Sequence, residues 1–287
     1  MNTPGDPGRH TGGRIGAPDA AAGARRTGGG RVILLHLRVG VMNELQYRAN
    51  FVIQLLQSLV AIGTGLVVLS LIFDRTDQLD GWTHPQLLIV MGIFTLVSGV
   101  IGFAIEPNMG RVMGDIERGT FDYVLTKPVD SQLLASCREF RIWRLTDAIV
   151  GLVVLGWGLS GLDVDLGARD VAGFVVTLVA GIVLIYCLWL VLTAGAFWVV
   201  RMDQVQELFT GLYRAGQYPV TVYPVWLKLM LTYLVPLGFA ITVPSESLTG
   251  RLTVSRFAIT LGFVVVAFVA TRWFWRRGTR RYSGASA

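Results

Sequence analysis

Charged side chains are scarce in this sequence of 287 residues, at 15% against 53% hydrophobic residues. A soluble domain of this size carries roughly a quarter charged residues, and its apolar runs are correspondingly short. Here several uncharged runs approach or exceed the ~20 residues that are needed to cross a bilayer. The composition therefore indicates a polytopic membrane protein and argues against a soluble domain.

Lysine occurs only twice, as Lys127 and Lys228, and neither residue follows a glycine. A phosphate-binding loop needs glycine, lysine and then serine or threonine, because backbone amides and the lysine together cradle the phosphates. No such loop is present in the sequence. The chain is therefore not a complete ATP-driven pump.

Histidine and cysteine are equally rare, and their positions predict no site. His10, His36 and His84 are scattered, and none belongs to a set with metal-ligand spacing. Cys137 lies in a polar segment and Cys187 lies inside an apolar run, so we do not expect them to form a disulfide. We predict no metal site and no catalytic residue in this chain.

The apolar runs also contain almost no ionisable groups in their middles. A proton- or sodium-coupled secondary transporter needs such a group at membrane depth, and an intramembrane enzyme needs paired acids, histidines or a serine and lysine. Asp147 and Glu106 lie near the ends of runs, and we interpret both as helix-end residues. An ion-coupled secondary transporter is disfavoured, and a non-transporting membrane scaffold stays open as an alternative.

Six apolar runs predict an all-α polytopic membrane protein with six transmembrane helices. The runs are 51–73, 85–105, 145–162, 171–200, 225–243 and 257–274. Pro236 is expected to kink the fifth span. Residues 201–224 are ambiguous and could lie in the interface or dip into the membrane.

The segments before the first span and at the end of the chain differ in character. Residues 1–30 are rich in Gly, Ala, Pro and Arg and predict a disordered cytoplasmic tail, and residues 285–287 are a short tail. Residues 31–48 place apolar side chains at helical spacing among arginines. This pattern predicts an amphipathic interfacial helix, or equally a simple extension of the first span.

The basic residues predict the orientation. The net charge is +6, and 23 of the 25 basic residues are arginines that lie beside the apolar runs. Sixteen Lys and Arg residues lie on one predicted side, in 31–50, 106–145, 201–224 and 272–287, whereas four lie on the other, in 74–84, 163–170 and 244–256. The positive-inside rule then places both termini in the cytoplasm and explains the basic balance without nucleic acid as a partner.

The longest polar interval between apolar runs is 106–144. Its charges fit one stripe of a helix, at Arg111, Asp115, Arg118 and Asp122, and its apolar residues form a second stripe, at Met109, Val112, Met113 and Ile116. Gly119 is expected to break this helix into two short pieces, and Pro128 to end the second. A helix with two such faces between membrane spans indicates docking on a soluble partner; lying on the lipid surface is the alternative.

Four features in this order resemble the permease subunits of ABC-2 type exporters, in the branch described as ABC-2 family transporter proteins. They are the amphipathic lead-in to the first span, GDIERGTFDYVLTKPV at 114–129, QYPVTVYPVWL at 217–227 with LVPLGFAITVP at 234–244, and the closing span that ends in RRYSG. The resemblance covers residues 31–284, as one permease domain.

The resemblance implies a transmembrane permease subunit of an exporter in the inner membrane, driven by a separate soluble ATPase dimer that binds ATP and Mg. It implies a second permease subunit, identical or paralogous, and no cofactor in this chain. The segment between spans two and three becomes a cytoplasmic coupling helix, with docking residues Met113, Asp115, Ile116, Glu117, Arg118, Phe121 and Tyr123.

The same resemblance implies a substrate path at the interface between the two permeases, lined by spans one, two and five. Possible hinge or packing residues near it are Gly92, Gly99, Gly102 and Pro236, and the alternative is that each is an ordinary membrane-helix residue. One departure is that residues 244–256 are short, whereas the family often carries re-entrant helices before its last span. Either this outer gate is reduced, or the segment 218–224 takes a different place. The substrate is not identified, and small hydrophobic or cationic compounds are the first expectation by analogy.

Overall fold

The computed structural model describes residues 48–162, 166–198, 209 and 211–282. The predicted tail at 1–30, nearly all of the predicted interfacial helix and the last residues lie outside this part. Within it, five helices are long and apolar enough to cross a membrane. This confirms an all-α polytopic membrane protein.

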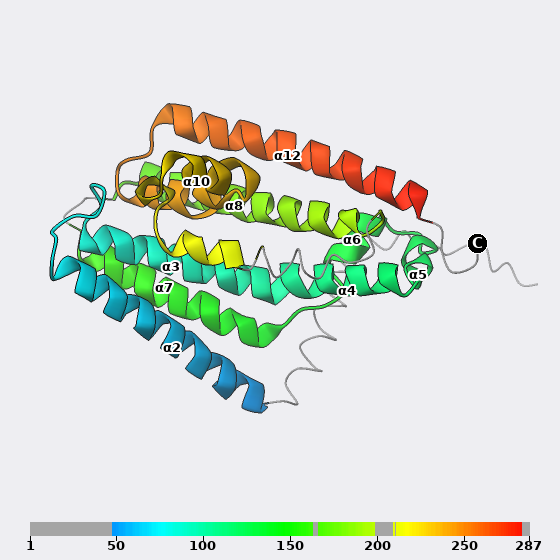
Figure 1. Ribbon diagram of the computed structural model, residues 1–287, viewed down its shortest axis with the longest axis horizontal. Coiled ribbons are helices and arrows are strands. Elements are labelled where there is room, and N and C mark those ends of the chain that lie inside the picture. Colours follow the sequence, from blue (N-terminus) through cyan, green and yellow to red (C-terminus); the bar gives the residue numbers. More distant parts are fainter. Residues whose placement is uncertain (1–47, 163–165, 199–208, 210, 283–287) are drawn as a thin grey trace, which may run out of the picture.

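The long helices lie side by side, and the chain alternates between two ends of the bundle (Figure 1). They are α2 (Arg48–Phe73), α3 (His84–Val100), α7 (Leu145–Ser160), α8 (Ala168–Gly195) and α12 (Val254–Arg281). We call the end with residues 74–83 and 249–253 the short-loop end. The end with residues 106–144 is the long-loop end.

Three helices that start at the short-loop end have capped first turns. The Thr83 backbone N–H donates to Gln86 Oε1 at 3.2 Å, Gly167 N–H donates to Asp170 Oδ2 at 3.0 Å, and Arg256 N–H donates to Thr253 Oγ1 at 3.3 Å. Such bonds satisfy amides that have no partner inside the helix. The boundaries of α3, α8 and α12 therefore follow from local polar residues in an otherwise apolar chain.

Glycines allow α3 and α7 to pack with their backbones in contact. A Cβ added at Gly92 would lie 2.5 Å from the backbone nitrogen of Leu155, and one at Gly99 would lie less than 3.0 Å from the backbone of Ala148. Small residues at such positions favour helix association in membranes, because the backbones approach closely. Gly92 and Gly99 therefore lie where the sequence suggested packing residues.

The helix of the second span continues beyond residue 105, where the predicted span ends. The π-helix η1 (Ile101–Ile105) and the helix α4 (Glu106–Glu117) continue α3, so that one helix runs over 34 residues, His84–Glu117. Pro107 lies in this helix and has no N–H to give to the carbonyl four residues earlier, that of Phe103. The backbone N–H of Arg141 donates to this carbonyl instead, at 3.0 Å.

The apolar stretch 225–243 does not cross as one kinked span. The segments Val225–Leu234 and Gly238–Leu248 are bent by 80° at a break that contains Pro236. They comprise α10 (Val225–Leu229), η5 (Met230–Leu234), η6 (Gly238–Thr242) and α11 (Val243–Leu248). Proline therefore separates two helical segments here rather than bending one helix.

Both ends of this bent pair lie at the short-loop end. On the side of its first residue, Trp82 Nε1 donates to Thr221 Oγ1 at 3.1 Å. Just after its last residue, the Arg251 guanidinium lies 4.6 Å from the centroid of the Trp82 ring and donates to the Gly81 carbonyl. The pair therefore enters the bundle and returns to the same end, which makes 225–248 the re-entrant element that we expected to be reduced.

Residues 211–221 lead towards the first residue of the bent pair. Tyr213 stacks on Phe94 halfway along the bundle, at 5.0 Å, and Thr221 contacts Trp82 at the short-loop end. Phe197 lies at the long-loop end, with its ring 5.6 Å from that of Phe121. Much of the segment that the sequence left ambiguous, 201–208 and 210, lies outside the described residues. The described helices therefore provide five candidate crossings.

The glycine contact gives a stability test. Gly99→Ala is expected to lower the stability of the purified chain relative to Gly156→Ala by about 2 kcal/mol, because the new methyl group meets the α7 backbone. Gly156 also lies in a membrane helix, but nothing stands within 4 Å of a Cβ there. The difference between the two variants removes the gain in helix propensity that both share. Thermal midpoints in detergent measure it, and equal midpoints would contradict the packing role.

Candidate functional site

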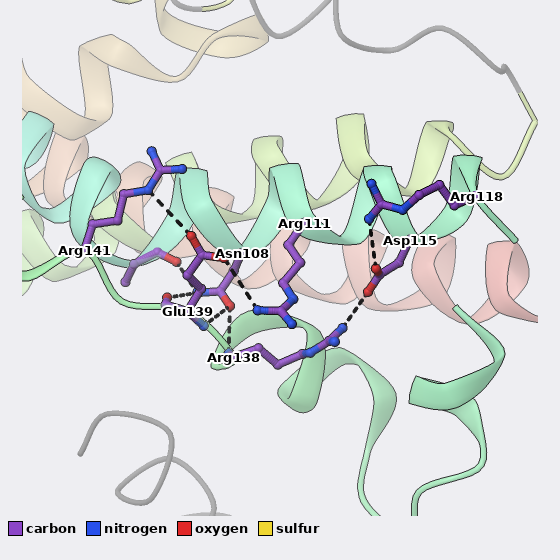
Figure 2. Close-up of polar contacts among 8 residues, drawn as sticks. Asn108, Arg111, Asp115, Arg118, Arg138, Glu139 and Arg141 are labelled. Atoms are coloured by element: carbon purple, nitrogen blue, oxygen red, sulfur yellow. Dashed lines mark hydrogen bonds and ion pairs between the residues drawn. The ribbon is translucent and has the colours of Figure 1, made fainter. Parts of the chain in front are cut away.

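The long-loop end is built around the fully buried side chain of Asn108, on α4. Its amide Nδ2 donates to the carbonyls of Ala104, at 2.7 Å, and Glu139, at 2.6 Å. Its Oδ1 accepts from the backbone N–H groups of Arg138, at 2.7 Å, and Glu139, at 2.9 Å. One side chain therefore bonds the returning segment 138–139 to α4 with every donor and acceptor in use (Figure 2).

Ion pairs reinforce the same contact. Arg138 Nη1 lies 2.7 Å from Asp115 Oδ2, with only 18% and 13% of the two side chains exposed. Arg118 approaches Asp115 from the other side, at 3.3 Å (Figure 2). The pairs of Arg111 and Arg141 with Glu139 are longer, at 3.7 and 3.6 Å, and more exposed, so they contribute little.

This arrangement corrects our interpretation of the charged stripe. Arg111 and Asp115 face the returning segment of their own chain rather than a free surface. The spacing of four and three correctly placed them on one helix face, but it could not show that residues 138–141 cover that face. The break at Gly119 is as predicted, with a φ of 69° that favours glycine.

Phe121 anchors the loop to two distant parts of the chain. It is fully buried, and its ring lies 5.6 Å from Phe197, 6.0 Å from Trp275 and 5.7 Å from Tyr282. These partners follow α8 or belong to the end of α12. Edge-to-face aromatic contacts of this kind contribute beyond the area that they bury.

Two short helices, α5 (Asp122–Leu125) and α6 (Ser131–Ser136), complete the loop. Asp130 caps α6 by accepting from the backbone N–H of Gln132, at 3.0 Å, and also pairs with Arg272 of α12. The hydrogen bond from Arg272 is the main reason why the pKa of Asp130 is lowered to about 2. Gln132 Nε2 donates to the Tyr186 hydroxyl of α8 at 3.1 Å. The loop is therefore bonded to α8 and α12 as well as to α4.

The expected docking residues differ in exposure. Asp115 is half-buried and pairs with Arg138. Met113, Ile116 and Phe121 are buried in the chain's own core, at 9% exposure or less. In this conformation they cannot contact a partner, since their side chains already pack inside. Glu117, Arg118 and Tyr123 are exposed, and 75% of Tyr123 is open. Docking itself stays a prediction, and only the exposed residues offer it a surface.

A polar cavity beside α2 is the feature that sequence reasoning missed. Its volume is about 690 Å³, and its lining comes from α2, α3, the start of α7 and residues 213–217. Asp147 is 9% exposed at this cavity. It accepts from Gln54 Nε2 at 3.1 Å and from the Ser58 hydroxyl, and Arg144 Nη1 lies 3.5 Å away.

Asp147 is a helix-end residue, as predicted, but it lies buried between helices rather than at a free edge. The polar residues of α2 at 54 and 58, four apart, were the available signal, because they form a polar stripe inside an apolar span. Gly102 contributes to the same place. A Cβ at Gly102 would lie 2.9 Å from the Arg144 side chain, so the glycine leaves room for the arginine that pairs with Asp147.

These features define a class: a multi-pass helical membrane protein with a re-entrant pair before its last span and a long loop joined to three of its helices. The family model for "ABC-2 family transporter protein" matches residues 59–286, and the chain belongs to this family. It is thus a membrane permease of an ABC transporter, a family whose members work with an ABC ATPase subunit. Comparisons with curated proteins and with solved structures give no match.

The Asp130 contacts predict a pH effect on the loop. Because the folded pKa is depressed, the stabilisation is present above the ordinary pKa of 3.8 and is lost as the pH falls towards 2. Protection of the amides of α6 from hydrogen exchange is expected to fall over this range by roughly 1 kcal/mol, a small value because the pair is partly exposed.

Asp130→Asn should show the lower protection already at pH 7 and little further change on acidification. Asp122→Asn, a change of the same charge in α5, is the control and should behave like the unchanged chain. A pH response that persists in Asp130→Asn would show that another group causes it.

Proposed function

We propose that the chain is the membrane subunit of an exporter, and that a separate ATPase, which binds ATP and Mg, moves it through the long-loop end. The observation that carries this proposal is the bonding of the loop to the spans. Asn108 joins the loop to the α3–α4 helix, Tyr186 joins it to α8, and Arg272 joins it to α12. A displacement of the loop therefore moves these helices with it.

The contact surface for the ATPase is the exposed tip of the loop. Tyr123 stands out there because an aromatic ring that is 75% exposed serves no packing role in its own chain. Glu117, Arg118 and Lys127 are exposed near it and supply charges of both signs. An exposed aromatic ring among charged groups is typical of the residues that dominate protein interfaces. In this arrangement the buried residues Met113, Ile116 and Phe121 do not contact the ATPase. They transmit the movement of the loop to the helices against which they pack.

The proposal includes an orientation in the membrane and a position for a second permease subunit. The long-loop end faces the cytoplasm, because most of the basic residues lie in its loops. A second permease packs beside α2. Only 11% of the most apolar stretch of this helix is buried within this chain. Apolar side chains such as Leu56, Val60 and Leu71 are more than half exposed on this helix.

The polar cavity is the proposed entrance for substrate from the long-loop end. It lies between α2 and α3, which are the first and second spans, and residues 213–217. Its volume of about 690 Å³ falls in the range of sites for small molecules, roughly 300–1,000 Å³. Its walls combine hydroxyl and amide groups with the stacked rings of Phe94 and Tyr213, which suits an amphiphilic compound.

An ion-coupled transporter is the second candidate, because Asp147 is a buried carboxylate in this cavity. Such a carrier must exchange its ion with water during each cycle. The carboxylate of Asp147 already accepts from Gln54 and Ser58 and lies beside Arg144. These contacts favour a structural role in which the side chain joins α2 to α7, and so favour the ATP-driven proposal.

The docking surface is tested with an exposed residue, so that the fold is left intact. Tyr123→Ala is expected to reduce the amount of ATPase that co-purifies with the tagged chain at least tenfold, because a central aromatic contact is lost. Trp226→Ala removes a ring of similar exposure, 68%, at the short-loop end and is the matched control. Unchanged co-purification of Tyr123→Ala, or an equal loss in the control, would reject the docking role.

The cavity is tested by cysteine labelling in a background with Cys137 and Cys187 replaced by serine. Ser98→Cys, which lines the cavity, is expected to react with a water-soluble maleimide at least tenfold faster than Val97→Cys. Val97 is the neighbouring residue and is fully buried in the core. Similar rates at the two positions would show that water does not reach the cavity.

A further inference from the structure

The last helix, α12, has two distinct faces along its whole length. Its buried residues are Thr260, Thr271, Trp275 and Gly278, which recur at helical spacing and face the bundle. On the opposite face Val265, Val266 and Val269 are each more than 60% exposed. An exposed valine face on a membrane-spanning helix is a surface for lipid chains.

The same outward face becomes basic at the long-loop end. Trp273 is 62% exposed, and Arg276, Arg277, Arg280 and Arg281 are all exposed beyond it. Steps of three and four residues keep these side chains on one side of the helix, the side that carries Val269. Together the five residues line a surface hollow of about 410 Å³. We call them the arginine stripe.

The arginines of this stripe differ from their neighbour Arg272, which faces inward and pairs with Asp130. Among the described residues, no carboxylate lies within ion-pair distance of Arg276, Arg277, Arg280 or Arg281. The one contact of their guanidinium groups that involves an aromatic ring is Arg277 over Trp273, at 6.0 Å. The stripe therefore presents several positive charges that the described residues do not neutralise.

The position of the stripe relative to the membrane indicates which groups neutralise its positive charges. Tryptophan is typical of the boundary between the hydrocarbon and the headgroups, and Trp273 follows the apolar part of α12 directly. At ~1.5 Å per residue, Arg276 to Arg281 stand roughly 5–12 Å beyond it along the helix, at the depth of lipid phosphates. Guanidinium groups bind phosphate oxygens through paired hydrogen bonds.

We propose that the arginine stripe is a binding site for the headgroups of anionic phospholipids. A protein partner with an acidic surface is the less suitable occupant, because the stripe shares its face with the lipid-exposed valines and opens sideways into the membrane. The site also has a mechanical consequence. Trp275 and Tyr282, on the same segment of α12, contact Phe121 of the long loop. A bound headgroup therefore steadies the segment to which the loop is fastened.

The test uses the full chain in nanodiscs of phosphatidylcholine that contain a small fraction of dansyl-labelled phosphatidylglycerol. Energy transfer from tryptophan measures how much of the anionic lipid collects around the protein. Each basic residue near an anionic surface contributes ~1 kcal/mol, so that Arg276→Gln with Arg280→Gln should lower the preference for phosphatidylglycerol roughly thirtyfold. The preference of the unchanged chain should fall as salt is added.

The matched control is Arg75→Gln with Arg169→Gln, which removes two exposed arginines at the short-loop end. This control should keep the preference, and dansyl-labelled phosphatidylcholine should show none in any variant. Thermal midpoints in phosphatidylcholine alone check that the double variant is folded, and the two single variants replace it if it is not. An unchanged preference in the stripe variants, or an equal loss in the control, would overturn the proposal.

This test is independent of the proposed exporter function, since it needs neither an ATPase nor a substrate. A chain that lost ATPase docking in Tyr123→Ala and kept the lipid preference would separate the two proposals.

Discussion

The buried amide of Asn108 is the contact on which the arrangement of the long-loop end depends. It bonds the backbone at 138–139 to α4 through three hydrogen bonds, and a fourth stays within the helix at Ala104, in a region where unsatisfied polar groups are costly. Next to it, the Arg141 N–H takes the Phe103 carbonyl that Pro107 leaves free. The second crossing and the first part of the loop therefore form one continuous helix of 34 residues, to which the returning segment is bonded.

The helix His84–Glu117 connects the long loop to the apolar helices of the bundle, which has few polar groups. Three residues hold the loop in place. Asn108 bonds it to α4, Phe121 packs on aromatic residues beyond α8 and at the end of α12, and Asp130 pairs with Arg272. Each contact depends on defined hydrogen-bond or ring geometry rather than on apolar burial alone. Rigid movement of the helices is the natural response of such a bundle to a force on the loop, because close-packed interiors deform little.

The short-loop end is organised in a different way. There the re-entrant pair begins and ends at the same end of the bundle. Trp82 contacts the chain just before the pair, at Thr221, and just after it, at Arg251. Glu246 of α11 pairs with Arg256 of α12, so that a charge in the bundle has a partner. The cavity near Asp147 belongs to the other half of the bundle. The polar cavity and the re-entrant pair thus lie towards different ends of the bundle.

The sequence by itself determined the class of fold and the family, because apolar length and turn residues are local signals. It also placed Gly119 at a helix break, whereas it named Gly92 and Gly99 only as possible packing residues near a path between two permeases. It could not distinguish a crossing from a re-entrant pair at 225–248, since both need the same apolar composition and Pro236 suits either.

Only the tertiary structure decided which side chains are free. Ile116 and Phe121 have the pattern of a docking face, yet both are buried, and Phe121 packs against Trp275 and Tyr282, which are far away in the chain. Asp147 is a helix-end residue in the sequence, but it becomes part of a cavity because α2 brings Gln54 and Ser58 to it. The physical reason is the same in each case: spacing shows which residues share a face, whereas burial depends on contacts across long separations in sequence.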